Sequence, residues 1–318
     1  MVLAIDLGGT TTKLGLFTKD GKLLHTHVCD TVVGKVIEEI HNSVKKWLST
    51  LNLTIEKDIS SIGFACVGPI DPEKGISLMA KKINWVNYPA LEVCKKYFKK
   101  PIYLTNDSRA AIVGEFWKGA GQGYKNVIGY TLGTGVGGGV ILNNKIYYGS
   151  HYWAGEFGHG GHMQDEYDCL SCGLPHCMEG LSSAVRIEKY MRQYIDKNPN
   201  SDLAKLQKNI DHPLTIFDVQ KMIKQDHKET TEILRYCLRP LGSHIAIMMY
   251  SIDPDVVLIG GGPSALGDYL LKHIHYWIEQ YARDFVYKKI PIKVCQLGNQ
   301  AGIYGAAWTA IQGLKNKS

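Results

Sequence analysis

The chain has 318 residues, of which 45% are hydrophobic and 21% are charged. This is the ordinary balance of a globular protein with a sizeable core, and the length suits two domains better than one. The net charge of +6 is small, and the lysines lie in scattered pairs. No basic stripe predicts nucleic-acid binding, although a mildly positive cleft for an anionic nucleotide remains open.

The sequence indicates no membrane or secretory segment. The start, residues 1–9, lacks the basic segment and the long apolar stretch of a signal peptide, and no apolar run is long enough to span a bilayer. There are eight cysteines, and five of them are dispersed and resemble reduced core residues. We therefore expect a cytoplasmic protein without a membrane partner. The dispersed cysteines are Cys29, Cys66, Cys94, Cys237 and Cys295.

The chain opens with a strand, a glycine turn, a strand, a hairpin turn and a third strand, at residues 2–5, 13–17 and 23–28. Glycines in the first turn let backbone N–H groups approach a phosphate closely. Asp6, at the end of the first strand, could hold Mg²⁺ through water. Alternatively, the glycines merely form the hairpin. The candidate phosphate-binding residues are Asp6, Gly8, Gly9, Thr10, Thr11 and Lys13.

A second candidate site follows a short strand at residues 102–104. Asn106 and Asp107 lie between that strand and a helix expected at residues 109–117. The carboxyl end of a strand is where open α/β sheets place ligands. Asp107 could equally be an ordinary helix N-cap. Before it, we expect helices at residues 32–51 and 90–98 and a buried strand at 59–67.

The glycine-rich stretch at residues 119–123 is a candidate domain boundary, because the opening pattern restarts after it. Strands are expected at residues 127–131, 136–142 and 145–148, with Gly133, Thr134 and Gly135 in the turn. This weak internal duplication suggests two phosphate turns facing each other across a cleft. The turn also fits a dinucleotide fingerprint, but a strand follows it where that motif needs a helix.

The remaining chain alternates helices with two short strands. We expect helices at residues 181–194, 217–223, 230–252, 266–281 and 301–311, and an exposed loop at 196–212. Strands are expected at 256–259 and 292–294, and the first runs into a glycine turn that contains Gly261 and Gly262.

Residues 154–179 hold three cysteines and three histidines with little apolar periodicity. Three thiols and an imidazole make a complete tetrahedral set for structural Zn²⁺, and the metal would fix an otherwise irregular loop. A redox pair or incidental core cysteines are the alternatives. The favoured ligands are His159, Cys169, Cys172 and Cys177, with His162 and His176 as rival nitrogen ligands.

Glu156 and Glu179 lie at the two ends of this loop. Two carboxylates held in fixed positions suggest a site for a polyhydroxylated ligand.

These residues resemble the ROK (repressor, open reading frame, kinase) sugar kinases of the actin-like, hexokinase-like superfamily. The resemblance covers essentially the whole chain. The N-terminal D-[IL]-G-G-T is matched at residues 6–10 and the second phosphate turn at 132–139. E-N-D-A is similar to Thr105-Asn106-Asp107-Ser108, where Ser108 stands in place of the common Ala. The segment most specific to the family, G-E-x-G-H followed by a cysteine loop, is matched at 155–159.

The resemblance implies an α/β, two-domain actin-like (ribonuclease H-like) ATPase fold with a cleft between the domains. The domains would be residues 1–118, joined by the C-terminal helix at about 300–313, and residues 119–299 with a zinc loop at 159–177. A homodimer is expected, since homodimers are common in the family.

The resemblance also implies transfer of the ATP γ-phosphoryl to the 6-hydroxyl of a hexose or N-acetylhexosamine, with Asp107 as general base. The cofactors would be ATP, Mg²⁺ and structural Zn²⁺. Gly261 and Gly262 would lie on the adenosine side. The sugar contacts would be Gly68, Asn106, Asp107, Glu156, His159 and Glu179.

Two segments differ from the family pattern. Cys169 lies one residue away from the usual position of the first cysteine. Residues 81–85 read Lys-Lys-Ile-Asn-Trp, where glucose-type members carry N-L-P-G-W, so a β-glucoside (disaccharide) kinase is the second reading. A non-catalytic sugar sensor is a third, but it would be expected to lack Asp107 or a phosphate turn. A DNA-binding repressor of the family would need a helix-turn-helix before the first strand.

Overall fold

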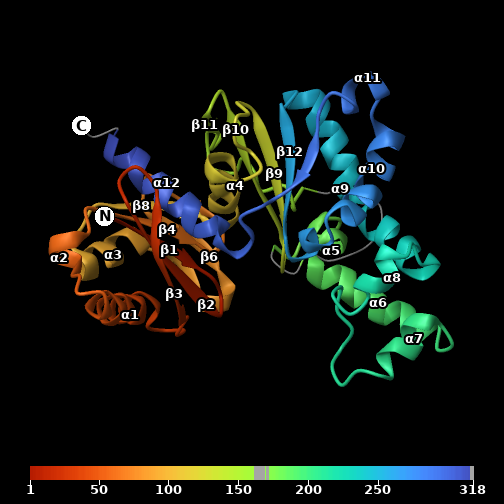
Figure 1. Ribbon diagram of the computed structural model, residues 1–318, viewed down its shortest axis with the longest axis horizontal. Coiled ribbons are helices and arrows are strands. Elements are labelled where there is room, and N and C mark those ends of the chain that lie inside the picture. The colour runs from red at the N-terminus through yellow and green to blue at the C-terminus, as the bar shows by residue number, and fades with distance from the viewer. Residues whose placement is uncertain (161–168, 170–171, 316–318) are drawn as a thin grey trace.

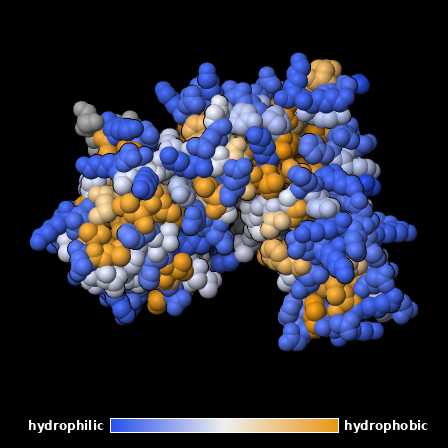
Figure 2. All heavy atoms as spheres, viewed as in Figure 1, coloured by the Kyte–Doolittle hydropathy of each residue, from blue (hydrophilic) through white to orange (hydrophobic). Residues whose placement is uncertain are grey.

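The computed structural model describes residues 1–160, 169 and 172–315, and all statements below concern those residues. Two five-stranded sheets stand side by side with helices packed around them (Figure 1). Figure 2 shows a notch in the surface between the two halves of the molecule. The α/β actin-like architecture predicted from the sequence is confirmed.

The first sheet has the strand order β3-β2-β1-β4-β8. Its central strand, β1, is an almost wholly buried apolar run, as expected for a strand covered on both faces. β1 pairs antiparallel with β2 and parallel with β4, and β4 pairs parallel with β8. The bounds are β1 Val2–Leu7, β2 Thr11–Phe17, β3 Leu23–Asp30, β4 Ser61–Cys66 and β8 Ile102–Asn106.

The second sheet has the order β11-β10-β9-β12-β13 and the same pattern of pairing. β9 pairs antiparallel with β10 and parallel with β12, and β12 pairs parallel with β13. The two sheets therefore share one topology, which confirms the internal duplication. The bounds are β9 Val127–Leu132, β10 Val136–Leu142, β11 Lys145–Ile146, β12 Val256–Gly261 and β13 Ile292–Val294.

Two helices lie between the sheets and pack on each other: α4 (Asp107–Lys118) and α12 (Ala301–Lys315). α12 covers the first sheet with small residues, and α4 covers the second, where Ile112 fills the space above Gly129 and Gly139. Small residues on α12 allow this close approach, as the sequence suggested.

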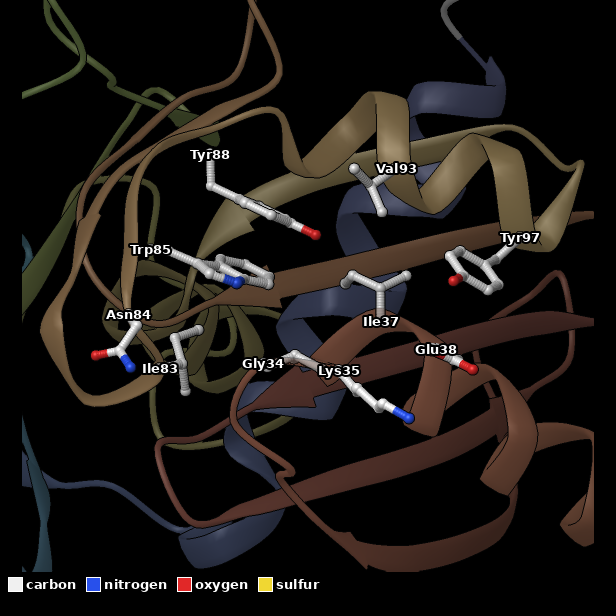
Figure 3. Close-up of a pocket in the computed structure, with 11 residues that line it drawn as sticks. Gly34, Lys35, Ile37, Glu38, Ile83, Asn84, Trp85, Tyr88, Val93 and Tyr97 are labelled. Atoms are coloured by element: carbon white, nitrogen blue, oxygen red, sulfur yellow. The ribbon is translucent and has the colours of Figure 1, made fainter.

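The first sheet is also covered by α1 (Val36–Thr50), α2 (Ile55–Asp58) and α3 (Ala90–Phe98). A small sheet of β5 (Ile70–Asp71), β6 (Ile76–Ala80) and β7 (Trp85–Tyr88) was not predicted. A pocket of about 230 Å³ opens between this small sheet, the start of α1 and α3 (Figure 3). Trp85 and Tyr88 stack on one wall, with ring centroids 4.1 Å apart.

The second sheet packs on a group of mostly helical segments. They are α5 (Glu179–Ser182), α6 (Ala184–Lys197), α7 (Asp202–Gln207), α8 (Gln220–Lys224), α9 (Lys228–Ile252), α10 (Asp268–Tyr281) and α11 (Asp284–Tyr287), with short 3-10 turns at Gly262–Leu266 and Gly298–Gln300. In the described part of the chain, no helix combines the length and the apolar character needed to cross a bilayer.

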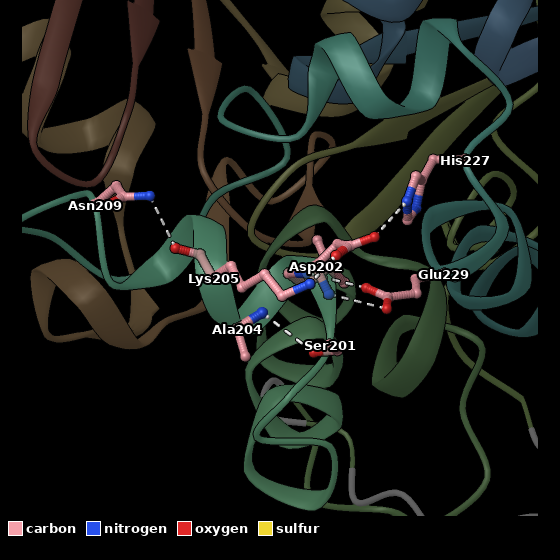
Figure 4. Close-up of polar contacts among 8 residues, drawn as sticks. Ser201, Asp202, Ala204, Lys205, Asn209, His227 and Glu229 are labelled. Atoms are coloured by element: carbon pink, nitrogen blue, oxygen red, sulfur yellow. Dashed lines mark hydrogen bonds and ion pairs between the residues drawn. The ribbon is translucent and has the colours of Figure 1, made fainter.

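The prediction of an exposed loop at residues 196–212 is wrong in part, because α7 lies within it. The side chain of Ser201 accepts a hydrogen bond from the Ala204 N–H, and the Glu229 carboxylate accepts from the N–H groups of Asp202 and Leu203 (Figure 4). The second cap comes from α9, so it is a long-range contact that the local sequence does not reveal.

Candidate active site and metal loop

The first predicted phosphate turn joins β1 to β2. The Gly8 N–H donates to the Thr11 carbonyl at 3.1 Å, and the Thr31 hydroxyl donates to the Gly8 carbonyl at 2.9 Å. Asp6 and Lys13 face each other in the strand register, with Asp6 Oδ2 3.9 Å from Lys13 Nζ. The turn therefore holds a carboxylate and an ammonium beside main-chain N–H groups, a combination that suits Mg²⁺ and phosphate.

Asn106, not Asp107, caps α4. Its Oδ1 accepts the Arg109 N–H at 2.9 Å, and its Nδ2 donates to the Gly68 carbonyl and to Asp107 Oδ1, each at 2.9 Å. Gly68 has φ +79°, and a Cβ there would lie 2.2 Å from the Met79 carbonyl oxygen. Three predicted sugar-site residues are thus joined by hydrogen bonds.

The Asp107 carboxylate is buried and has one oxygen that accepts hydrogen bonds from described residues. Its Oδ1 accepts from Asn106 Nδ2 and, at 2.8 Å, from the Ser108 N–H. No hydrogen bond from a described residue ends on Oδ2. Burial, together with the nearby charge of Asp6, raises the pKa of Asp107 to about 7. A carboxyl group with a pKa near neutrality is matched to proton abstraction.

The second predicted phosphate turn lies close to Asp107. Gly137 on β10 approaches the side chain of Ser108, because a Cβ at Gly137 would lie 2.2 Å from Ser108 Oγ. Gly133 and Gly135 form the turn, with the Gly133 N–H donating to the Gly135 carbonyl at 2.9 Å. α4 thus places Asp107 close to β10, the strand that follows the second predicted phosphate turn.

Gly261 and Gly262 lie beside this turn at the carboxyl end of β12. Gly261 pairs with Leu132 in the parallel ladder, and its φ of +92° places it where a Cβ would lie 2.0 Å from the Leu132 carbonyl oxygen. Ligands of open α/β sheets bind at such carboxyl ends. The position suits a nucleotide whose phosphates extend toward Gly133.

Sequence reasoning missed Arg109, which is only 2% exposed and reaches from α4 to the loop before Glu156. Its Nη2 donates to the carbonyls of Tyr152 and Ala154 at 3.1 and 3.0 Å, and its guanidinium lies 5.0 Å from the centre of the Tyr148 ring. Burial raises the pKa of Glu156, and the positive charge of Arg109 opposes that rise. The sequence offered one indication of this role, because Arg109 is followed in the helix by a run of small and apolar residues.

The four predicted zinc ligands come together. The ligand atoms of His159, Cys169, Cys172 and Cys177 all lie within 4.8 Å of one another. Cys172 Sγ is 3.7 Å from Cys177 Sγ, and Cys169 Sγ is 3.6 Å from His159 Nδ1. Tetrahedral Zn²⁺, with bonds of about 2.0–2.3 Å, would fit between donors at such separations. His176 is not in this group, and His162 lies outside the described residues.

Glu179 links the metal loop to the second phosphate turn. It is 6% exposed, Oε2 accepts the Val136 N–H at 3.0 Å, and Oε1 accepts from Cys169 Sγ at 3.1 Å. A Cβ at Gly135 would lie 2.1 Å from Oε2. The metal would hold the loop that positions Glu156, His159 and Glu179 without taking part in the chemistry.

The divergent segment at residues 81–85 lies beside the first phosphate turn. The stem of Lys82 packs on Gly9, whose Cβ would lie 2.7 Å from Lys82 Cδ. Asn84 has the left-handed φ of 58°, so it occupies a conformation that glycine adopts easily. Its side chain lines the pocket of Figure 3 with Trp85, and Asp107, Glu156 and Glu179 do not line that pocket.

Comparisons with known proteins identify the family. A family model described as the ROK family matches residues 2–313. A glucokinase of Halalkalibacterium halodurans is 31% identical over 314 residues, covering 98% of this chain and 94% of that protein. An N-acetylmannosamine kinase of Haemophilus influenzae is 26% identical, covering 96% of this chain and 94% of that protein.

Among solved structures, a ROK family glucokinase from Streptomyces griseus in complex with glucose and AMPPNP matches with a TM-score of 0.81 at 28% identity. The match covers 98% of this chain and 99% of that one.

The fold and these comparisons define a carbohydrate kinase. Its loop carries a donor set suited to structural Zn²⁺. The chain belongs to the ROK family, as its motifs predicted.

Proposed function

We propose that the protein transfers the γ-phosphoryl group of Mg-ATP to the 6-hydroxyl of a hexose or N-acetylhexosamine, with Asp107 as general base. The observation that carries the proposal is the buried carboxylate of Asp107. Its Oδ1 accepts two hydrogen bonds, and its pKa is raised to about 7. The relatives named glucokinase and N-acetylmannosamine kinase support the two sugar classes.

Each group has a proposed part. Asp107 accepts the proton of the attacking hydroxyl, while Asn106, Gly68, Glu156, His159 and Glu179 orient the sugar. The two glycine turns hold the phosphates, with Lys13 opposing their charge. Mg²⁺, when bound, would neutralise charge that develops on the transferring phosphoryl group. Positioning and neutralisation supply most of the rate enhancement in phosphoryl transfer, and a base adds a factor of about 10²–10⁴.

The test is ADP release with Mg-ATP and a panel of glucose, mannose, fructose, allose, N-acetylglucosamine, N-acetylmannosamine and cellobiose. We expect one monosaccharide to stimulate release strongly, and NMR of the product to show a 6-phosphate. Asp107→Asn should lower kcat about 10²–10⁴-fold and leave sugar binding by calorimetry largely intact. Asp284→Asn, an exposed carboxylate on α11, is the control. Near wild-type turnover by Asp107→Asn would mean that another group is the base.

Cellobiose is in the panel because residues 81–85 favour a second candidate. Lys82 and Asn84 stand where glucose-type members carry N-L-P-G-W, and this segment lies beside the first phosphate turn. Stimulation by cellobiose alone would replace the hexose proposal with a β-glucoside kinase. We further propose domains at residues 1–118 and 119–299, with the helix at about 300–313 returning to the first.

A further inference from the structure

Glu115 is a fully buried carboxylate far from the predicted substrate contacts. It is 0% exposed and lies two turns after Asp107 on α4. Its Oε2 accepts from the N–H groups of Ala120 and Gln296, each at 2.9 Å, and its Oε1 accepts from the Leu297 N–H at 2.7 Å. One side chain therefore bonds two segments that are far apart in the sequence.

Those two segments are the connections between the sheets. In the described chain, the first sheet ends with β8, and residues 119–126 lead from α4 to β9 of the second sheet. Residues 295–300 return from β13 to α12, which packs on the first sheet. Both connections donate main-chain N–H groups to the same carboxylate, so Glu115 lies at the junction of the two halves. Figure 1 shows its helix, α4, between the two sheets.

The packing around Glu115 keeps its carboxylate in place. A Cβ at Gly119 would lie 2.0 Å from Oε2, so this position has no room for a side chain. On the same helix, the backbone of α4 is in contact with the backbone of α12, since a Cβ at Gly305 would lie 1.8 Å from the Ala110 carbonyl oxygen. The two helices therefore form one rigid unit at the carboxylate.

That unit also supports reacting groups. α4 begins with Asp107, and Gly302 on α12 lies directly behind Asp6, because a Cβ at Gly302 would be 2.3 Å from Asp6 Oδ2. The second sheet carries Gly133 and Gly261. The junction thus determines how far the sugar-side groups lie from the nucleotide-side glycines.

We propose that Glu115 is a positioning residue that fixes the pivot between the two sheets and so aligns the γ-phosphoryl group with the acceptor hydroxyl on Asp107. A carboxylate has about four lone-pair sites, so it can accept three N–H donors and keep them through a small rotation of the halves. An amide of the same size presents its own N–H₂ to at least one of these donors. Hinges of domain motions lie at the connections between the parts that move, and Glu115 bonds both connections.

The test compares the kcat of two variants, Glu115→Gln and Asp255→Asn, each made in the full chain with its metal bound. Asp255, an exposed residue, is the control for loss of carboxylate bonds to one connection, because its Oδ2 accepts the Lys125 and Asn126 N–H groups of the first connection at 2.9 and 2.8 Å and no hydrogen bond among the described residues joins it to the second. We expect Glu115→Gln to lower kcat about 10–100-fold, since a misplacement of about 1 Å can cost 10². The Kd values for sugar and for ATP, measured separately, should change less than about 3-fold.

A second readout distinguishes positioning from simple stability. Small-angle scattering should show a decrease in the radius of gyration when sugar is added to the wild type and to Asp255→Asn, and a smaller decrease for Glu115→Gln. A wild-type kcat with unchanged scattering in Glu115→Gln would overturn the proposal. So would an equal loss of kcat in Asp255→Asn.

Gly119→Ala gives an independent test if Glu115→Gln fails to fold, because the added methyl displaces the carboxylate while all of its atoms remain. It should show the same loss of kcat, and wild-type kcat there would also overturn the proposal. The inference rests on sugar kinase activity, so wild-type turnover is established first. Absence of turnover in the wild type would reject the proposed function, whereas a defect confined to the variants concerns Glu115 alone.

Discussion

The raised pKa of Asp107 bears on stability as well as on the proposed catalytic role. Its pKa of about 7 lies above the value of an unfolded aspartate because burial disfavours the charged form. The folded protein therefore binds more protons than the unfolded chain at pH values between about 4 and 7. Through that window stability falls as pH rises, so the ionised, active form is the less stable one.

The first residue-scale prediction concerns pH. In wild-type protein, kcat/KM should fall as the pH decreases below about 7, because the base becomes protonated. Asp107→Asn should raise Tm by a few degrees at pH 8, and this gain should disappear by pH 5. Thermal melts of nucleotide-free protein at the two pH values check it. A lower Tm for the variant at pH 8 would contradict the burial argument.

The second prediction concerns Arg109. Arg109→Met keeps the stem but removes the donors to the Tyr152 and Ala154 carbonyls, which should lower the free energy of unfolding by about 2–3 kcal/mol. Sugar affinity should fall as well, since Glu156 loses its nearby cation. Urea unfolding and calorimetry measure the two effects. Arg109→Lys should recover little, because an ammonium lacks the planar fork of donors.

At the scale of elements, the sequence predicted well what is encoded locally. The strand–turn–strand units around Gly8 and Gly133 are continuous in sequence, and both turns were found. The strands of residues 70–88 pair with their neighbours in sequence and were missed because they are short. Helix α7 was missed because part of its cap comes from Glu229, far along the chain. The roles of Arg109 and Glu115 were missed for the same reason, since each acts on backbone groups far along the chain.

The metal loop gives an element-scale prediction. Purified protein should contain about one Zn²⁺ per chain, and Cys172→Ser or chelation should lower Tm and weaken ATP binding as well as sugar binding. ATP binding should weaken because the same loop holds Glu179 in place: the Glu179 N–H donates to the Gly158 carbonyl beside His159, and the Glu179 carboxylate accepts the Val136 N–H beside the second phosphate turn. Metal analysis and nucleotide titration check this. Cys29→Ser, outside the loop, is the control, and unchanged ATP affinity after zinc removal would disprove the link.

At the scale of the whole molecule, the repeated sheet topology explains why the chain has two similar glycine turns, one at the same place in each sheet. The sequence suggested the repeat, but only the shared strand order establishes it. The placement of the halves relative to each other depends on the connections at residues 119–126 and 295–300, whose bonds to Glu115 span the chain. Local patterns carry no signal for such a junction.

Oligomeric state is the prediction at this scale. Exposed apolar side chains on α9 to α11, including Ile247 and Tyr250, each 53% exposed, and Phe285, 66% exposed, are suited to a contact between copies. Together with the family resemblance, they favour a homodimer. Light scattering after gel filtration should give about twice the chain mass. Ile247→Lys should yield monomer, and a wild-type monomer at micromolar concentration would reject the dimer.

The grouping of three thiols at the metal loop has a consequence for oxidation. Cys172 is exposed and its sulfur lies 3.7 Å from that of Cys177. Bound zinc holds these sulfurs as ligands, whereas metal-free protein in air would hold the exposed Cys172 thiol beside the buried Cys177 sulfur, a pair that can oxidise to a disulfide. A brief loss of zinc under oxidising conditions would then become lasting damage, since oxidised sulfurs no longer take the metal back. Sugar phosphorylation by this protein would thus depend on the supply of zinc and on the reducing state of its surroundings together.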